Sequence, residues 1–255
     1  MIPIKSIEEI QKMRRAGEVS ARVLAEVCEK VAPGVSTQDL DDYTKQAMDR
    51  YGAISSSYGF RSGKRVFPGY GCFSVNEEIV HGIPSKRKIL KEGDIISIDL
   101  AMSVDGYCGD NTRTVLVGAV PEEVTRLVSV TQAALFAGIA AALPGNTIGH
   151  ISSAIQKVAD INHLGVVREL VGHGIGRAMH EDPQVPNYGI AGKGPVLKPG
   201  MTLAVEPMFT QGSPKIAVDA DGWTVRTADH RMAAHWEHTI LITENAPEVL
   251  TLPQK

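Results

Sequence analysis

Apolar side chains recur at the spacing of an α-helix in four segments of the chain. The first segment begins at Ser6, which stands three residues before Glu9 as in a capping box, and it reaches Lys30. Pro33-Gly34 follows, a pair that ends helices. The sequence therefore predicts a long first helix with a defined start and stop.

The remaining helical segments repeat this arrangement. A second helix is predicted over 37–50, a third over 121–143 and a fourth over 147–162, with Thr37 and Thr147 as N-caps. Helix, Pro-Gly and helix thus occur twice, 111 residues apart, and a strand-rich stretch follows each time. This favours two related halves, although chance recurrence stays open because Pro-Gly is a common helix end.

A period of two replaces the helical period between positions 94 and 103. Apolar residues share one face there, and Asp99 and Ala101 share the other. Asp105-Gly106 predicts a two-residue hairpin turn, with a return strand to about Gly118. Counting back from that turn places Asp110 opposite Ala101, diagonal to Asp99 on the same face.

Two carboxylates in that relation lie about 7–8 Å apart at the backbone and can converge on one cation. Asp is uncommon in strands, and two like charges so placed repel each other unless something positive intervenes. A metal role for Asp99 and Asp110 and an ordinary surface position both stay open at this point.

Further candidate ligands lie in the second half. Glu206 and Glu237 are flanked by apolar, strand-like runs without a neighbouring Lys or Arg, and a buried carboxylate without a partner is costly. His81, His173 and His180 complete the set. Any one of these histidines alone is more often a hydrogen-bonded structural residue than a ligand.

Oxygen-rich ligands with one imidazole suit Mn, Fe(II), Co or Zn, and the set is large enough for two ions. A pair of such ions can activate water for attack on a carbonyl. Competing motifs are absent: Arg177 breaks the dinucleotide pattern after Gly172, and there is no Walker, H-E-x-x-H or G-x-S-x-G sequence.

Composition restricts the setting. Of the 255 residues, 43% are apolar and 22% are charged, which is typical of a globular chain, and the net charge of −3 gives no basic field for nucleic acid. Cys28, Cys72 and Cys108 form no C-x-x-C pair, which favours free thiols in a reducing compartment. Without a signal peptide or a membrane-length apolar run, we expect a cytoplasmic protein with no membrane contact.

Long motifs in the chain resemble those of bacterial type I methionine aminopeptidases, in the family's order and over nearly the whole length. They occupy residues 76–84, 99–110, 172–183, 197–207 and 237–239. The resemblance implies the pita-bread α/β (α+β) fold, in which two pseudo-symmetric halves pack helices on a curved antiparallel sheet. We expect one catalytic domain over 1–255, with halves of about 1–118 and 119–255. The implied activity is removal of the initiator methionine from nascent chains with a small second residue.

The same resemblance implies two divalent ions, of which the physiological metal stays open. Asp110 and Glu237 would bridge both ions, Asp99 would bind one, and His173 and Glu206 the other.

It also implies roles around the substrate. His81 would contact the scissile amide, His180 would steady the carbonyl oxygen, and Glu206 would also move a proton. The residues expected to contact the methionine side chain are Cys72, Phe67, Trp223, Met208, Met179, Tyr58 and Phe60.

The chain departs from the family pattern around that pocket. Met179 stands where phenylalanine is usual, Ala101 where threonine is common, and His235 where glutamine is common. The segment 58–71 is also a few residues longer than the pattern. The effect of these changes on the pocket stays open, although flexible Met179 can refill the volume of an aromatic ring.

Related families fit less well. Type II methionine aminopeptidases carry a long insertion where only 26 positions separate His180 from Glu206, and proline-specific relatives carry a large preceding domain where only 80 residues precede His81. A non-catalytic binding module would have lost ligands, and none is lost. Substrates are expected to be N-terminal Met-peptides of nascent chains, the protein is expected to be a monomer, and docking on the ribosome stays open.

Overall fold

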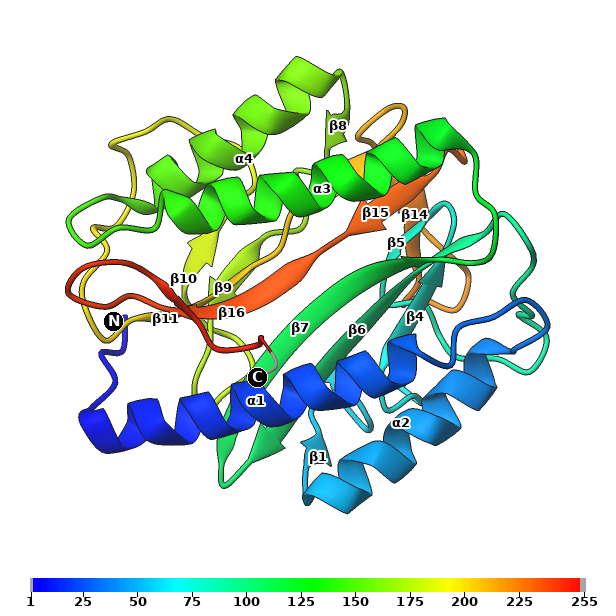
Figure 1. Ribbon diagram of the computed structural model, residues 1–255, viewed down its shortest axis with the longest axis horizontal. Helices are drawn as coiled ribbons and strands as arrows, with labels where there is room; N and C mark the ends of the chain where they lie inside the picture. Colours follow the sequence, from blue (N-terminus) through cyan, green and yellow to red (C-terminus); the bar gives the residue numbers. More distant parts are fainter. Residues whose placement is uncertain (1, 253–255) are drawn as a thin grey trace.

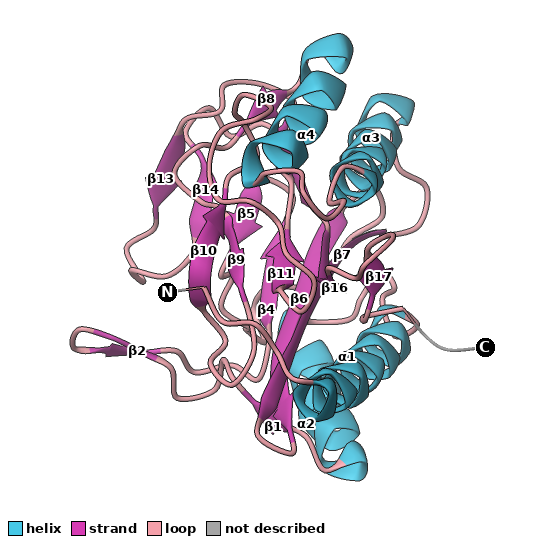
Figure 2. Cartoon of the chain, turned by 90° about the vertical axis from the view of Figure 1, so that its left-hand side faces the viewer, coloured by secondary structure: helices cyan, strands magenta, loops and turns pink. Residues whose placement is uncertain are grey.

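The computed structural model describes residues 2–252, in which four α-helices cover one side of an antiparallel sheet (Figures 1 and 2). One helix pair lies over each half of the sheet, and the opposite side of the sheet is free of helices. The helices are α1 (Ile7–Cys28), α2 (Thr37–Tyr51), α3 (Glu122–Ala140) and α4 (Ile148–Asn162).

The predicted helices are present, with small corrections at their ends. Ser6 and Glu9 form the predicted capping box of α1. The cap of α2 is Ser36 rather than Thr37, because the Thr37 hydroxyl donates to the carbonyl of Ser85 instead. Helix α3 ends before the predicted position 143, since the chain already turns there and the Asn146 side chain donates to a freed carbonyl.

The main sheet has the strand order β1-β6-β7-β16-β11-β9-β10, with β4 added beside β6 and β17 beside β16. Its strands all pair antiparallel. They are β1 (Ile54–Ser55), β4 (Cys72–Val75), β6 (Ile95–Val104), β7 (Tyr107–Leu116), β9 (Gly172–Gly174), β10 (Glu181–Val185), β11 (Thr202–Val205), β16 (Glu237–Leu241) and β17 (Glu248–Val249).

Three smaller sheets complete the described part of the chain, and they were not predicted from the sequence. Their short strands show too few alternating residues to be recognised. They are β2 (Arg61–Ser62) with β3 (Arg65–Val66); β5 (Glu78–Val80) with β13 (Ile216–Val218) and β14 (Val225–Thr227); and β8 (Gly165–Val166) with β12 (Met208–Thr210) and β15 (Ala233–His235).

The central hairpin has the predicted register. Val104 pairs with Tyr107 across the turn, and Ala101 pairs with Asp110. The return strand ends two residues before the predicted Gly118, whose positive φ of 66° is incompatible with a strand.

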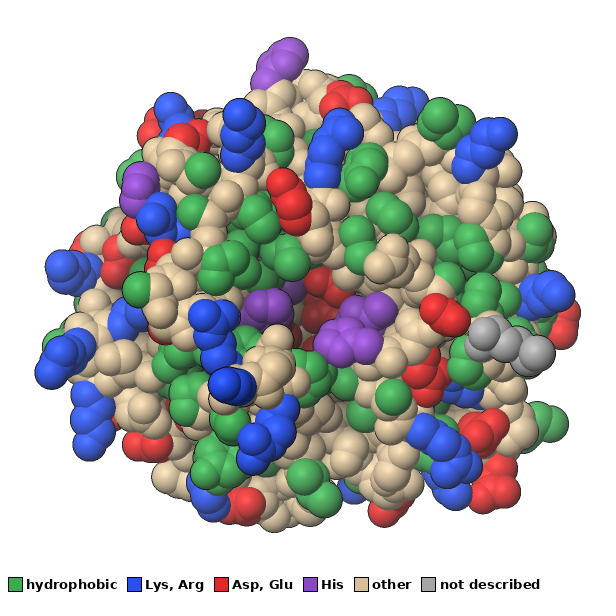
Figure 3. All heavy atoms as spheres, turned by 180° about the vertical axis from the view of Figure 1, so that it is seen from behind, with side chains coloured by type: hydrophobic (Ala, Val, Ile, Leu, Met, Phe, Trp, Pro, Cys, Tyr) green, Lys and Arg blue, Asp and Glu red, His purple; other side chains and the backbone are tan. Residues whose placement is uncertain are grey.

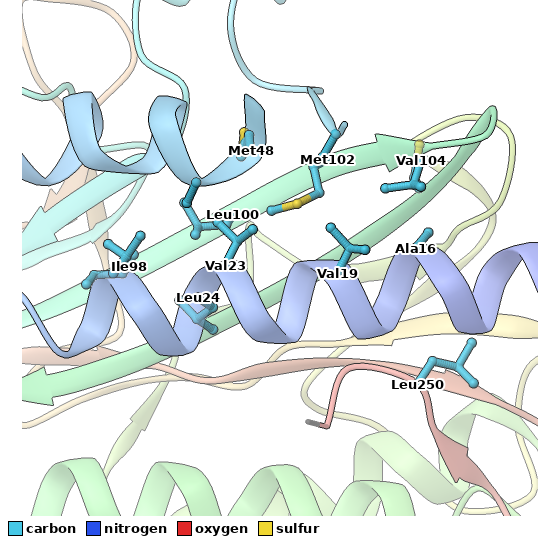
Figure 4. Packing of buried hydrophobic residues seen from close by; sticks show 14 of the residues in the cluster. Ala16, Val19, Val23, Leu24, Met48, Ile98, Leu100, Met102, Val104 and Leu250 are labelled. Carbon is cyan, nitrogen blue, oxygen red and sulfur yellow. The ribbon is translucent and has the colours of Figure 1, made fainter. Parts of the chain in front are cut away.

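The apolar face of β6 packs under the first helix pair (Figure 4). Ile98, Leu100 and Met102 share a buried cluster with Val19 and Val23 of α1. This packing directs the other face of β6, which carries Asp99, away from the helices.

The close approach of α1 to β7 depends on a glycine. A Cβ atom at Gly109 would lie 2.7 Å from the backbone oxygen of Ala16, so no larger residue fits without a backbone shift. Because Asp110 is the next residue, the helix contact and the polar face are set by neighbouring positions of one strand.

The same backbone hydrogen bonds recur in the two halves. Gly34 N–H donates to the carbonyl of Leu90 (2.8 Å), and Gly145 N–H donates to that of Leu197 (3.0 Å). Both glycines follow the prolines that stop α1 and α3, and both acceptors precede a strand of the main sheet. This recurrence supports two related halves, while their division at 118 and 119 stays a prediction.

All three cysteines are free, as predicted. No helix between residues 2 and 252 combines the length and apolar character that a membrane crossing needs.

Candidate metal centre and substrate cavity

A row of side chains crosses four strands on the face of the sheet without helices. The register pairs Cys72 with Asp99, Asp99 with Thr112, and Thr112 with Glu237. Directly paired residues point to the same face of a sheet, so the four side chains share one side. Asp110 stands two positions before Thr112 on β7 and joins them there.

The second half of the chain supplies the remaining donors. His173 lies on β9 and is paired with Ala204 of β11. Glu206 was predicted within a strand, but the structure places it just past the end of β11. The Nδ1 atom of His173 lies 2.9 Å from the carbonyl oxygen of Gly174, to which it donates, so the lone pair of Nε2 faces the site.

Donor atoms of Asp110, His173 and Glu237 lie within 4.8 Å of one another. His173 Nε2 is 3.6 Å from Glu206 Oε1 and 3.9 Å from Asp110 Oδ2. Asp99 lines the same cavity. The structure therefore brings all five ligands that the resemblance implies to one cavity, and the separations among Asp110, His173, Glu206 and Glu237 leave room for cations between them.

The acids lack compensating charge. Burial, together with repulsion from neighbouring carboxylates, raises the pKa values of Asp110, Glu206 and Glu237 well above their ordinary values, and burial raises the pKa of Asp99 to about 6. Asp110 Oδ1 and Glu237 Oε1 are buried and have no hydrogen-bond partner among the described residues. No Lys or Arg in residues 2–252 forms an ion pair with these acids. Four carboxylates and an imidazole in this state fit divalent cations.

His81 and His180 line the cavity beside the acids. In Figure 3, purple histidine side chains lie on either side of red acidic side chains in the hollow. His180 is exposed, and its ring lies edge-on to His173 with centroids 4.4 Å apart. Loss of water contact inside the cavity lowers the pKa of His81 and, although part of its ring is exposed, that of His180; the nearby His180 lowers the pKa of His81 further. Both rings are therefore neutral near pH 7, and each can donate one N–H.

His81 has a positive φ of 58°, which is uncommon for a residue with a side chain. The neighbouring backbone holds it there: Gly82 N–H donates to Ser74 Oγ (3.1 Å), and Phe73 N–H donates to the Gly82 carbonyl (2.8 Å). Such backbone strain persists where the surrounding structure enforces it, often at functional sites.

The cavity has a volume of about 220 Å³ and an apolar wall beside the acids. Phe67 and Trp223 lie edge-to-face there, with ring centroids 5.4 Å apart. Of the residues expected to contact methionine, those that line the cavity are Cys72, Phe67, Trp223, Met208, Met179 and Phe60.

Tyr58 is not brought to this cavity. Its side chain is 55% exposed and stacks on Tyr70, with ring centroids 4.5 Å apart. The chain turns between Tyr58 and Phe60, so these two neighbouring aromatic residues take different directions, which their spacing alone does not reveal.

The three residues expected to depart from the family pattern lie around the cavity. Ala101, Met179 and His235 all line the cavity. His235 is 2% exposed, its Nε2 lies 3.7 Å from Glu206 Oε2, and both its ring nitrogens lack a hydrogen-bond partner among the described residues. Burial lowers its pKa to about 3, so the ring is neutral.

Some residues in or next to the cavity were missed by the sequence analysis. Thr112 donates to Glu237 Oε2 at 2.9 Å, and the hairpin register, which places it opposite Asp99, could have identified it. Ser57, Val80, Leu170 and Val171 line the cavity itself, but no motif marks them.

Comparisons with known proteins agree with this geometry. The model of metallopeptidase family M24 matches residues 11–244. Methionine aminopeptidase B of Synechocystis is 46% identical over 97% of this chain and 90% of that protein. A methionine aminopeptidase of Clostridium acetobutylicum is 45% identical over 99% of both chains.

Solved structures agree as well. The methionine aminopeptidase of Thermotoga maritima has a TM-score of 0.94 at 42% identity and covers 99% of this chain and 100% of its own. The prolidase of Pyrococcus furiosus shares the fold, with a TM-score of 0.78 at 23% identity, but this chain covers only 66% of it. The predicted pita-bread fold is thus confirmed, and the chain belongs to metallopeptidase family M24, among the type I methionine aminopeptidases.

Proposed function

We propose that this protein removes the initiator methionine from nascent chains that have a small second residue. The observation that carries the proposal is the set of uncompensated acids around His173, at the floor of a cavity with an apolar wall. The acids require cations, and the wall suits an unbranched apolar side chain.

We propose further that two divalent ions, Co, Mn, Fe(II) or Zn, bind at this floor. Asp110 and Glu237 would each hold both ions, and one oxygen of each side chain, which has no hydrogen-bond partner among the described residues, supports this role. Asp99 would hold one ion, and His173 and Glu206 would hold the other. When bound, the ions supply an activated water molecule and a polarised substrate carbonyl.

The protein side chains then handle the protons. His81 contacts the amide nitrogen of the scissile bond, and His180 donates its N–H to the carbonyl oxygen as negative charge develops there. Glu206 takes the proton that the attacking water loses and passes it to the leaving amine, so that the C–N bond breaks and a free N-terminus remains. His180 lies at the rim of the site, next to His173, which fits a contact with substrate rather than with metal.

The methionine side chain packs against the apolar wall of the cavity, which is formed by Cys72, Phe67, Trp223 and Met208. Met179 adds a flexible thioether where an aromatic ring is usual, which allows sulfur contacts with the substrate. We expect norleucine to replace methionine at a cost of at most about 1–3 kcal/mol, since pockets of this kind discriminate weakly between unbranched apolar chains.

We propose that the enzyme acts in the cytoplasm as a monomer on N-terminal Met-peptides. The test is peptide hydrolysis with protein reloaded separately with each candidate metal. Release of methionine from Met-Ala peptides, with little release from Leu-Ala or Met-Leu peptides, supports the proposal. Equal cleavage of all three peptides contradicts both the methionine pocket and the small second residue.

A further inference from the structure

The β2–β3 hairpin lies within residues 58–71, the segment expected from the sequence to be longer than the family pattern. Arg61 pairs with Val66 and Ser62 with Arg65, and the two strands pair with no other strand. The hairpin projects from the body on the side away from the helices (Figure 2).

The root of the hairpin belongs to the cavity wall. Phe60 and Phe67 join it on either side, and Phe67 N–H donates to the Phe60 carbonyl at 2.8 Å. Both rings lie edge-on to Trp223, with centroids 6.3 and 5.4 Å away, and Phe60 also lies 6.3 Å from the ring of His180. The hairpin is therefore fixed relative to the residue proposed to contact the substrate carbonyl.

The hairpin carries only positive charge. Arg61, Lys64 and Arg65 are exposed, and no acidic residue occurs between positions 58 and 71. Arg65 Nη1 donates to the Gly222 carbonyl at 3.2 Å, which anchors the hairpin through a neutral group and leaves the charge uncompensated. Lys and Arg side chains also gather beside the cavity mouth in Figure 3.

The acidic residues beside Gly222, which Arg65 contacts, have other partners. Asp219 pairs with Arg226, and the carboxylate of Asp221 accepts hydrogen bonds from Trp223 N–H and Thr224. Within residues 2–252, none of the three hairpin cations forms an ion pair with these acids. The cations of the tip are thus available to a ligand.

The path of a substrate follows from the proposed function, on which this inference rests. With the first side chain against the apolar wall and the first carbonyl at His180, the rest of the peptide is taken to leave past Phe60, because the ring of Phe60 lies edge-on to that of His180 with centroids 6.3 Å apart. Arg61 follows directly in the chain. An extended peptide advances about 3.3 Å per residue, so on this path the residues beyond the second, about the third to the fifth, lie beside the hairpin.

We propose that Arg61 and Lys64 bind acidic side chains at the third to fifth positions of the substrate, so that the hairpin selects nascent chains with acidic residues there. Each exposed pair contributes a few-fold preference, which salt screens. Arg65 holds the hairpin in position through Gly222.

The test compares kcat/KM for Met-Ala-Asp-Glu-Gly, Met-Ala-Asn-Gln-Gly and Met-Ala-Lys-Lys-Gly at low and high salt. The variant is the double substitution Arg61→Glu with Lys64→Glu. The control is Lys157→Glu with Lys193→Glu, which makes the same charge change at exposed positions outside the cavity. Met-Ala amide, which has no third residue, measures the reaction without the hairpin contact.

The wild type and the control should prefer the acidic peptide over the neutral one by roughly 3–10-fold at low salt, and less at high salt. The hairpin variant should reverse the order of the acidic and basic peptides and cleave Met-Ala amide as the wild type does. If the variant cleaves the three peptides in the same order of kcat/KM as the wild type, the inference is overturned. Co-sedimentation with ribosomes is measured as well: a loss of it in the variant, with the peptide order unchanged, would show that the hairpin binds RNA instead. No cleavage of Met-Ala amide by the wild type overturns the proposed function, and the inference with it.

Discussion

At the scale of single residues, the site is defined by carboxylates whose negative charge no Lys or Arg among the described residues compensates. Asp99, Asp110 and the other donors were predicted from the sequence, because strand alternation and motif order identify them. Tyr58 was assigned to the pocket, but a local turn directs it elsewhere. The sequence did not predict that the imidazole of His235 lacks a hydrogen-bond partner among the described residues, because the strands around it are far apart in the sequence.

Asp110→Ala and Glu237→Ala should each remove metal from both positions, because each residue is proposed to bridge. Metal analysis after gel filtration measures this directly. Asp41→Asn is the control, since Asp41 is a buried acid outside the cavity and should leave the metal content unchanged. Two tightly bound ions per chain in either alanine variant would show that the bridging assignment is wrong.

His180→Ala should separate substrate contact from metal binding. The ring lies at the rim and is proposed to donate to the carbonyl oxygen, so the variant should keep its metal and lose about 10²–10³-fold in kcat. Metal content and steady-state kinetics of one preparation provide both readouts. Loss of stoichiometric metal would instead make His180 a ligand.

At the scale of elements, the long helices and the central hairpin could be predicted, because capping residues, Pro-Gly stops and Asp105-Gly106 act locally. The small sheets could not, since strands of two or three residues gain their stability from neighbours rather than from their own pattern. Two of these sheets nevertheless adjoin the cavity: Phe60 and Phe67, which line it, stand on either side of the β2–β3 hairpin, and β15 carries His235.

The contact between α1 and β7 leads to a prediction for Gly109→Ala. The new methyl group would meet the Ala16 carbonyl, so helix and strand must separate beside Asp110. We expect a loss of about 1–3 kcal/mol in the free energy of unfolding, the usual cost of overpacking, together with weaker metal binding. Urea unfolding and metal titration measure the two effects. An unchanged urea midpoint would show that the packing is looser than the structure indicates.

Helix α2 is joined to the segment before β4 by Asp41. Its Oδ1 accepts hydrogen bonds from the backbone N–H groups of Tyr70 (2.7 Å) and Gly71 (3.0 Å), yet burial raises its pKa to about 6 from the ordinary 3.8. The folded state thus holds this proton more tightly than the unfolded state. The resulting stability is present below about pH 4 and is lost as the pH rises through about 6.

Asp41→Asn retains an acceptor oxygen and removes the titration. The free energy of unfolding of the variant minus that of the wild type should therefore be larger at pH 7 than at pH 4, by about 1–3 kcal/mol. Urea unfolding at both pH values gives the difference. The same difference at both values would show that Asp41 does not titrate in this range.

At the scale of the whole molecule, the site combines segments that are far apart in the sequence. The hairpin of β6 and β7 supplies Asp99 and Asp110, and the segments of β9, β11 and β16 supply His173, Glu206 and Glu237. Motif order was enough to predict this donor set. The shape of the cavity was not predictable, since its wall includes loop residues such as Leu170 and Val171 that carry no motif.

The central claim is that the assembled acids act through bound metal on the first peptide bond of a Met-peptide. The most direct test is the release of methionine from Met-Gly-Met by protein whose metal content is measured before and after chelation. We predict two divalent ions per chain in the active protein, single-residue cleavage, loss of turnover with loss of metal, and recovery on reloading. Full turnover by metal-free protein would contradict the account.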